Sequence, residues 1–151
     1  MLLKDIHDKG HFSFHESAAD WREAIRMSCQ PMEADGTTDA RYAQAMIDCV
    51  EKHGPYIVIL PGVAMPHSTE NAEGAFDTTI GFMRLEKPVS FEEGNPEKDA
   101  SLFFTLVSTN ADEHMENMQR LYTVLTNEAV LEELKKATSA EDLLRIDAML
   151  E

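Results

Sequence analysis

Two short runs of this sequence are almost continuously apolar and have the length of a β-strand. The first, Tyr56–Leu60, is rich in β-branched residues and lies between Pro55 and Pro61, and the second is Ser101–Ser108. A strand that is apolar on both faces has to be covered on both faces, which is typical of sheets packed between helices. We therefore expect an α/β fold in which Tyr56–Leu60 and Ser101–Ser108 are buried strands.

Apolar residues at three- and four-residue spacing predict helices on either side of these runs. Two such segments cover Trp21–Met32 and Tyr42–Val50, and Thr38 is the expected N-cap of the second. Asn110, with Glu113 three residues later, resembles a capping box and predicts the start of another helix. Two shorter helical patterns fill the rest of the C-terminal third.

Weaker patterns predict the remaining strands and connections. Thr78–Leu85 is a further strand candidate, and the two-residue alternation over 11–15 predicts a short edge strand. The charged segment 86–100 is expected to be a surface connection with a short hairpin strand around Val89. Because Pro61–His67 contains two prolines and a glycine, we expect neither regular helix nor central strand there.

These segments together predict one domain over residues 1–151, with a mixed, largely parallel sheet of about five strands and helices on both faces. A chain of 151 residues suits one domain and buries roughly 70% of its unfolded surface, so it needs no disulfide or metal to fold. Cys29 and Cys49 have neither the number nor the spacing of a disulfide framework or a zinc site. We expect two buried free thiols and a reducing compartment.

The charge balance argues against strongly anionic partners. The chain has 28 Asp and Glu against 13 Lys and Arg, a formal net charge of −15, so nucleic acid and anionic membranes should repel it. The longest aliphatic run, Ile57–Leu60, is far shorter than the roughly 20 residues that span a bilayer. Because the first residues also lack a signal-peptide core, we expect a cytoplasmic protein that does not insert into membranes.

Two histidines are candidates for chemistry. His67 follows the first apolar run, and His114 lies near the start of the helix that follows Ser108. If those two strands are neighbours, their carboxyl ends bring His67 and His114 together at one edge of the sheet. Two imidazoles there could bind a metal, act as general bases or transfer a phosphoryl group, whereas the alternative is two isolated surface histidines.

Three further histidines lie near the amino end of the chain. His7, His11 and His15 would share one face of an extended strand, which could suggest a metal cluster. Histidines side by side on an exposed strand are more often a solvated surface. We therefore expect no metal there.

The segment Tyr56–His67 resembles a known active-site motif. Its core, Gly62–His67 (Gly-Val-Ala-Met-Pro-His), resembles the active-site segment of the mannitol/fructose-type enzyme IIA domains of the bacterial phosphoenolpyruvate-dependent sugar phosphotransferase system. His53–Tyr56 and Pro61–Gly62 are most similar to the ascorbate-type branch. His114 matches the second active-site histidine of the family, and the resemblance covers nearly the whole chain.

This resemblance implies a phosphocarrier that needs no cofactor. His67 would accept a phosphoryl group from the phosphorylated carrier protein HPr and pass it to a cysteine of an enzyme IIB, and His114 would stabilise the phosphoryl group. The sugar would be ascorbate or a related compound. The acidic surface would complement a basic face on the donor carrier.

Two alternatives stay open, and the first is motivated by a departure from the family pattern. Ser68–Glu70 follow the histidine where the family usually has Gly or Ala and then often Arg or Thr, and Glu70 adds a negative charge near a dianionic group. The first alternative is a regulatory IIA-like domain whose phosphorylation state controls a protein partner. The second is a metal hydrolase using His67, His114 and a carboxylate such as Glu113 or Glu70, although the ligand spacings match no metal motif.

Overall fold

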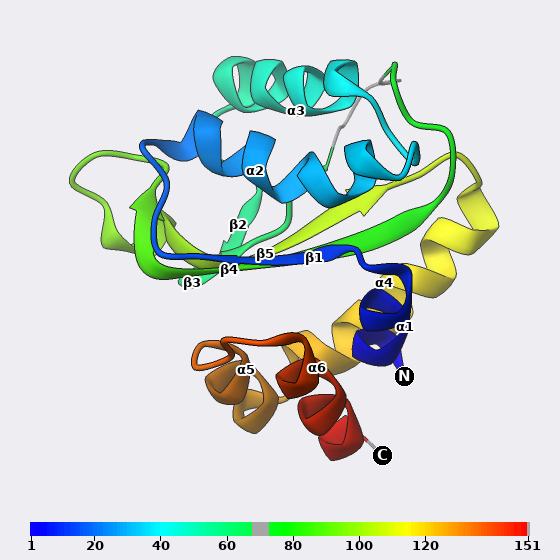
Figure 1. Ribbon diagram of the computed structural model, residues 1–151. Coiled ribbons are helices and arrows are strands. Elements are labelled where there is room, and N and C mark those ends of the chain that lie inside the picture. Colours follow the sequence, from blue (N-terminus) through cyan, green and yellow to red (C-terminus); the bar gives the residue numbers. More distant parts are fainter. Residues whose placement is uncertain (68–72, 151) are drawn as a thin grey trace.

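The computed structural model describes residues 1–67 and 73–150 (Figure 1). Its helices are α1 (Leu2–Lys9), α2 (Trp21–Ala34), α3 (Ala40–His53), α4 (Ala111–Leu125), α5 (Glu128–Leu134) and α6 (Ala140–Asp147), with the short 3-10 turns η1 (Pro96–Lys98) and η2 (Ala148–Leu150). Its strands are β1 (Phe12–His15), β2 (Val58–Leu60), β3 (Gly62–Ala64), β4 (Thr79–Ser90) and β5 (Asp99–Val107). They form one sheet in the order β1-β4-β5-β3-β2.

The sheet is mixed and has helices on both faces, which confirms the predicted fold class. Among the described residues, β1 with β4 and β3 with β5 are parallel pairs, and β4 with β5 and β2 with β3 are antiparallel pairs. Helices α2 and α3 cover one face, while α1, α4, α5 and α6 cover the other (Figure 1). Successive side chains of a strand point to opposite faces of the sheet, so β4 and β5 contribute to both cores. Met83 and Phe103 pack on the α2–α3 side, and Phe82 and Phe104 pack on the opposite side.

The first apolar run is less buried than its composition predicts. Within Tyr56–Leu60 only Val58–Leu60 forms a strand, and this strand, β2, lies at an edge of the sheet. Ile57 and Val58 are buried, whereas Ile59 and Leu60 are 38% and 39% exposed. The expectation of a fully buried strand was therefore wrong, because β2 has a neighbouring strand on one side only.

The prediction that Pro61–His67 contains no central strand was also wrong. Gly62–Ala64 forms β3, which lies between β2 and β5. The two prolines, Pro61 and Pro66, flank these three residues, so the strand keeps the backbone donors it needs for pairing. Gly62 has φ of +89°, a left-handed value that a side chain would strain, and this conformation reverses the chain between β2 and β3.

Strand β4 is longer than expected because it continues through part of the charged segment. Thr79 to Arg84 pair with β5, and after an irregularity Val89 pairs with Ala100. The hairpin strand around Val89 is thereby confirmed as the distal end of β4. Proline at position 88 lies within the irregular stretch, where a missing backbone donor is tolerated.

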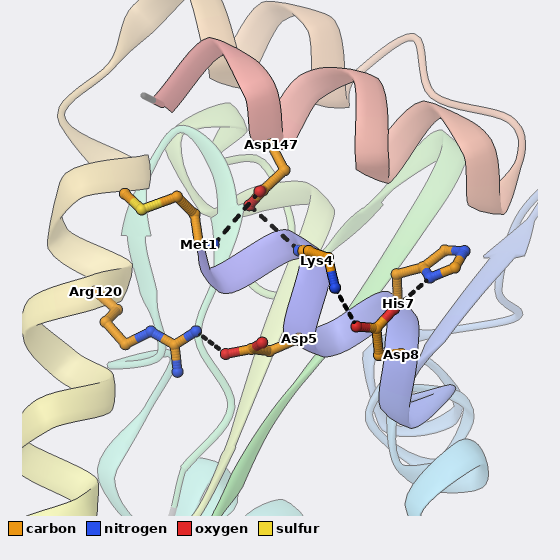
Figure 2. Close-up of polar contacts among 7 residues, drawn as sticks. All are labelled: Met1, Lys4, Asp5, His7, Asp8, Arg120 and Asp147. Atoms are coloured by element: carbon orange, nitrogen blue, oxygen red, sulfur yellow. Dashed lines mark hydrogen bonds and ion pairs between the residues drawn. The ribbon is translucent and has the colours of Figure 1, made fainter.

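Helix α1 was not predicted, and its amino end is capped by a residue of α6, which is far along the chain but adjacent in space. The Asp147 carboxylate of α6 accepts the Lys4 backbone N–H (3.2 Å), and Asp5 pairs with Arg120 of α4 (Figure 2). Lys4 also pairs through its Nζ with Asp8 at 2.7 Å. Helix α1 is therefore held between α4 and α6.

One detail near the first helices differs from the sequence prediction. The N-cap of α3 is Asp39, whose carboxylate accepts the Arg41 N–H (2.9 Å), and not Thr38. Thr38 is buried, and its backbone forms a bridge to Ala75, which commits it to an extended position before the helix. The short edge strand predicted over 11–15 is confirmed as β1.

The three amino-terminal histidines do not share one strand face. His7 is in α1, beside Asp8, and His15 ends β1. His11 is buried, with Nδ1 2.9 Å from the Thr79 hydroxyl and Nε2 2.6 Å from the Asp35 carboxylate. Partial burial raises the pKa of Asp35, but hydrogen bonds from Thr37 and His11 outweigh it and hold that pKa below its usual value.

Both cysteines are buried free thiols, as predicted. Burial raises the pKa of the Cys29 thiol to about 12, so this group is protonated at neutral pH and is a poor nucleophile. None of the helices in residues 1–67 and 73–150 is both long enough and apolar enough to cross a bilayer.

Candidate functional site

His67 lies just beyond the carboxyl end of β3. The Pro66 carbonyl accepts the Leu106 N–H of β5 at 2.9 Å, so hydrogen bonding to β5 continues two residues past β3. The Met65 N–H, in turn, donates to the Ile57 carbonyl at 2.8 Å. These bonds on both sides fix the segment that carries His67 at the edge of the sheet formed by the carboxyl ends of β3 and β5.

The imidazole of His67 is oriented by its own backbone segment. Its Nδ1 lies 2.6 Å from the Met65 carbonyl oxygen, and a carbonyl can only accept a hydrogen bond. Nδ1 therefore carries the proton of the neutral ring, and the lone pair is on Nε2. The local fold thus prepares Nε2 as the nucleophilic or metal-binding atom.

Tyr56 contacts His67 from the start of the same segment. Its hydroxyl donates to the His67 carbonyl oxygen at 2.5 Å, and the two rings meet edge to face, with centroids 5.0 Å apart and planes at 89°. In the sequence, Tyr56 stands out only as part of a strand and of an ascorbate-like motif. Tyr56 lies beside His67 because β2 and β3 run antiparallel, which brings the residues before β2 next to those after β3. The sequence did not predict this pair, because the prolines argue against a strand at β3.

His114 lies in the first turn of α4, at the same edge of the sheet. Asn110 is the N-cap of α4 and accepts the Glu113 N–H at 3.0 Å, which confirms the predicted helix start. Helix α4 begins shortly after β5 ends, and β5 is the parallel neighbour of β3. His67 and His114 are thus placed at the carboxyl ends of adjacent parallel strands.

Thr78 holds the loop that leads into α4. Its buried hydroxyl accepts the backbone N–H groups of Thr109 (2.9 Å) and Asn110 (3.0 Å), and lies 3.1 Å from the Thr109 hydroxyl. These bonds join the segment before β4 to the N-cap of α4. No sequence pattern pointed to Thr78, because its partners are 31 and 32 residues away.

Replacing Thr78 by valine is expected to destabilise the protein by about 1–3 kcal/mol. Valine keeps the shape of threonine but leaves the backbone N–H groups of Thr109 and Asn110 without this acceptor, and each hydrogen bond lost costs about 0.5–1.5 kcal/mol. Chemical denaturation of Thr78→Val and wild type measures the difference, and Thr78→Ser, which keeps the hydroxyl, should restore most of the lost stability. Equal unfolding free energies for Thr78→Val and wild type would contradict this account.

The site does not contain a ready-made metal centre in the described ranges. Within residues 1–67 and 73–150, no three His, Cys, Asp or Glu side chains gather closely enough to hold a metal ion. Glu113 is exposed in the first turn of α4. Ser68–Glu70, including the carboxylate considered as a metal ligand, lie outside the described residues.

Comparison of the sequence with known proteins identifies the family of the chain. A family model described as "Phosphoenolpyruvate-dependent sugar phosphotransferase system, EIIA 2" matches residues 5–147. The chain is 36% identical over 146 residues to the mannitol-specific cryptic phosphotransferase enzyme IIA component of Escherichia coli (strain K12), covering 97% of each. It is 30% identical over 148 residues to the ascorbate-specific PTS system EIIA component of Salmonella choleraesuis (strain SC-B67), covering 95% of this chain and 94% of that protein.

A solved structure agrees with these sequence relatives. The fold matches a chain in the complex of enzyme IIAMtl and phosphorylated enzyme IIBMtl from Escherichia coli, with a TM-score of 0.76 and 28% identity over 91% of this chain and 94% of that one. The family model covers nearly the whole chain. The chain therefore belongs to the type 2 enzyme IIA family of the phosphoenolpyruvate-dependent sugar phosphotransferase system.

Proposed function

We propose that His67 accepts a phosphoryl group from the phosphorylated carrier protein HPr and passes it to a cysteine of an enzyme IIB. The observation that carries this proposal is the 2.6 Å contact between His67 Nδ1 and the Met65 carbonyl. It holds the neutral imidazole in the form whose Nε2 lone pair can attack phosphorus. Phosphoryl transfer depends mainly on such positioning and on charge stabilisation.

The transfer step exchanges one phosphorus–nitrogen bond for another. The Nε2 lone pair of His67 attacks the phosphorus of the donor phosphohistidine, and the donor's phosphorus–nitrogen bond breaks with its electron pair returning to the donor imidazole. Nδ1 of His67 keeps its proton, so the phosphorylated ring is cationic and its Nδ1–H remains donated to Met65. Because the bond formed and the bond broken are alike, the step is nearly balanced and reversible.

His114 and the start of α4 stabilise the transferring group in this proposal. His114 is in the first turn of a 15-residue helix, whose N-terminal N–H groups and dipole favour an anion. A donor placed where charge develops on phosphoryl oxygens lowers the barrier to transfer. The location of His114 at the edge of the sheet that carries His67 supports this role.

The onward partner and the sugar are proposed from the relatives. The enzyme IIA chain of the Escherichia coli mannitol system is found in a complex with phosphorylated enzyme IIB, which supports an enzyme IIB as recipient here. Ascorbate or a related sugar is our proposed cargo, supported by the ascorbate-specific relative; the mannitol-type relative makes mannitol the competing choice. Two buried free thiols suit the reducing cytoplasm, where we place the reaction.

A labelling and chase experiment tests the proposed function. The chain, incubated with labelled phosphoenolpyruvate, enzyme I and HPr, should acquire an acid-labile phosphohistidine that peptide mapping assigns to His67. Chase onto enzyme IIB proteins of the ascorbate and mannitol systems should transfer the label to the cognate one. Absence of label on the folded chain overturns the proposal, and label that no enzyme IIB removes supports the regulatory alternative instead.

A further inference from the structure

We propose that Tyr56 is a positioning residue that sets the orientation of the His67 imidazole for phosphoryl transfer. The inference rests on the proposed function of His67 and extends it to a second side chain. Tyr56 makes two contacts with different parts of His67: its hydroxyl donates to the His67 carbonyl, and its aromatic ring lies edge to face with the imidazole. Together they restrain both the backbone and the ring.

The backbone around Tyr56 is itself fixed, so the Tyr56 side chain can serve as an anchor for His67. The Tyr56 N–H donates to the Gly54 carbonyl at 2.8 Å, just after α3 ends. The next residue, Ile57, is buried and accepts the Met65 N–H, which ties this turn to the segment that carries His67. The Tyr56 ring also contacts His53 of α3 edge to face, with centroids 6.4 Å apart.

His67 needs such an anchor because it lies past the last strand residue. Strand β3 ends at Ala64, and the Pro66 carbonyl makes the final bond to β5 before His67. The Tyr56 hydroxyl supplies a partner for the carbonyl that comes next along the chain. With that carbonyl held, the Nδ1 of His67 stays within reach of Met65, and Nε2 keeps the direction needed for attack.

The Nδ1-protonated form of His67 gives a direct measure of this positioning. Loss of Tyr56 should loosen the Nδ1 contact to Met65, so the proton should redistribute to Nε2 in part of the population. That change lowers the fraction of protein with a nucleophilic Nε2. A misplaced reacting group can cost up to about 10²-fold in rate even when it remains present.

The test compares Tyr56→Phe and Tyr56→Leu with wild type by two measurements. Nitrogen-15 NMR of unphosphorylated protein reports the His67 tautomer, and rapid-quench labelling from phosphorylated HPr reports the maximal transfer rate and KM. We expect Tyr56→Phe to slow transfer about three- to tenfold, the effect of one hydrogen bond. We expect Tyr56→Leu to slow it on the order of 10²-fold, with a larger Nε2–H population and little change in KM.

Tyr122→Phe is the matched control, since it removes the same hydroxyl from an exposed position on α4. It should keep the wild-type tautomer and rate. Wild-type tautomer and rate in folded Tyr56→Leu would overturn the inference; if that variant does not fold, the same result in Tyr56→Phe overturns it. If wild-type protein takes up no label, the proposed function fails, while the NMR comparison still decides whether Tyr56 orients His67.

Discussion

His67→Ala protein is expected to take up no phosphoryl group from HPr while keeping its fold. The substitution removes the Nε2 lone pair that the contact of Nδ1 with the Met65 carbonyl leaves available for attack. His67 is only partly buried and lies outside both apolar cores, so its loss should affect stability little. Labelling of wild type and variant, with circular dichroism of both, measures this.

His7→Ala is a suitable control for the first experiment. His7 lies in α1, where its ring stacks on Phe12 of β1, and two strands, β4 and β5, separate β1 from β3. His7→Ala should label at the wild-type rate. Label on His67→Ala equal to that on wild type would refute the assignment of His67 as acceptor.

His114→Ala is expected to label on His67 but to transfer the group roughly 10²–10³ times more slowly. The estimate is the usual effect of removing one donor that stabilises charge in a transition state. The backbone N–H groups at the start of α4 remain, so part of the stabilisation should survive. Transfer to a cognate enzyme IIB should slow along with uptake from HPr, because the same phosphoryl oxygens are involved.

Rapid-quench kinetics of uptake and chase measure this second effect, and His114→Gln is its matched variant. The glutamine amide can donate a hydrogen bond without a ring, so it should recover part of the lost rate. If His114→Ala takes up no label and His67→Ala does, the roles of the two histidines are reversed. Unchanged kinetics in His114→Ala would remove it from the site.

The parts of the fold that depend on local sequence were predictable. The start of α4 was predicted from Asn110 and Glu113 because a cap is formed within one turn of its helix. The same local rules failed for β3, since two prolines close together usually exclude a central strand. Here they flank a strand of only three residues, and the neighbours that make it central are β2 and the distant β5.

The two candidate histidines could be named from a sequence motif, whereas residues that act through tertiary contacts could not. His67 and His114 stood out in the sequence, but the expected neighbour of Ser101–Ser108 was Tyr56–Leu60. The structure has β3, and not β2, beside β5, and the two histidines follow β3 and β5. Thr78 and Tyr56 did not stand out, because their significance depends on the backbone groups that the fold brings to them. The Tyr56 hydroxyl bonds a carbonyl 11 residues away, and the Thr78 hydroxyl bonds an N–H 31 residues away.

The cap of α1 has a consequence for how the protein is made. Lys4 and Asp147 are separated by 143 positions, yet the carboxylate of Asp147 satisfies a backbone N–H in the first turn of α1 (Figure 2). An eight-residue helix is marginal by itself in water. During synthesis, α1 emerges before α4 and α6, the two helices to which it is bonded. Helix α1 is thus translated well before the helix that caps it, and its apolar side stays without that cover in the nascent chain until α6 has been made.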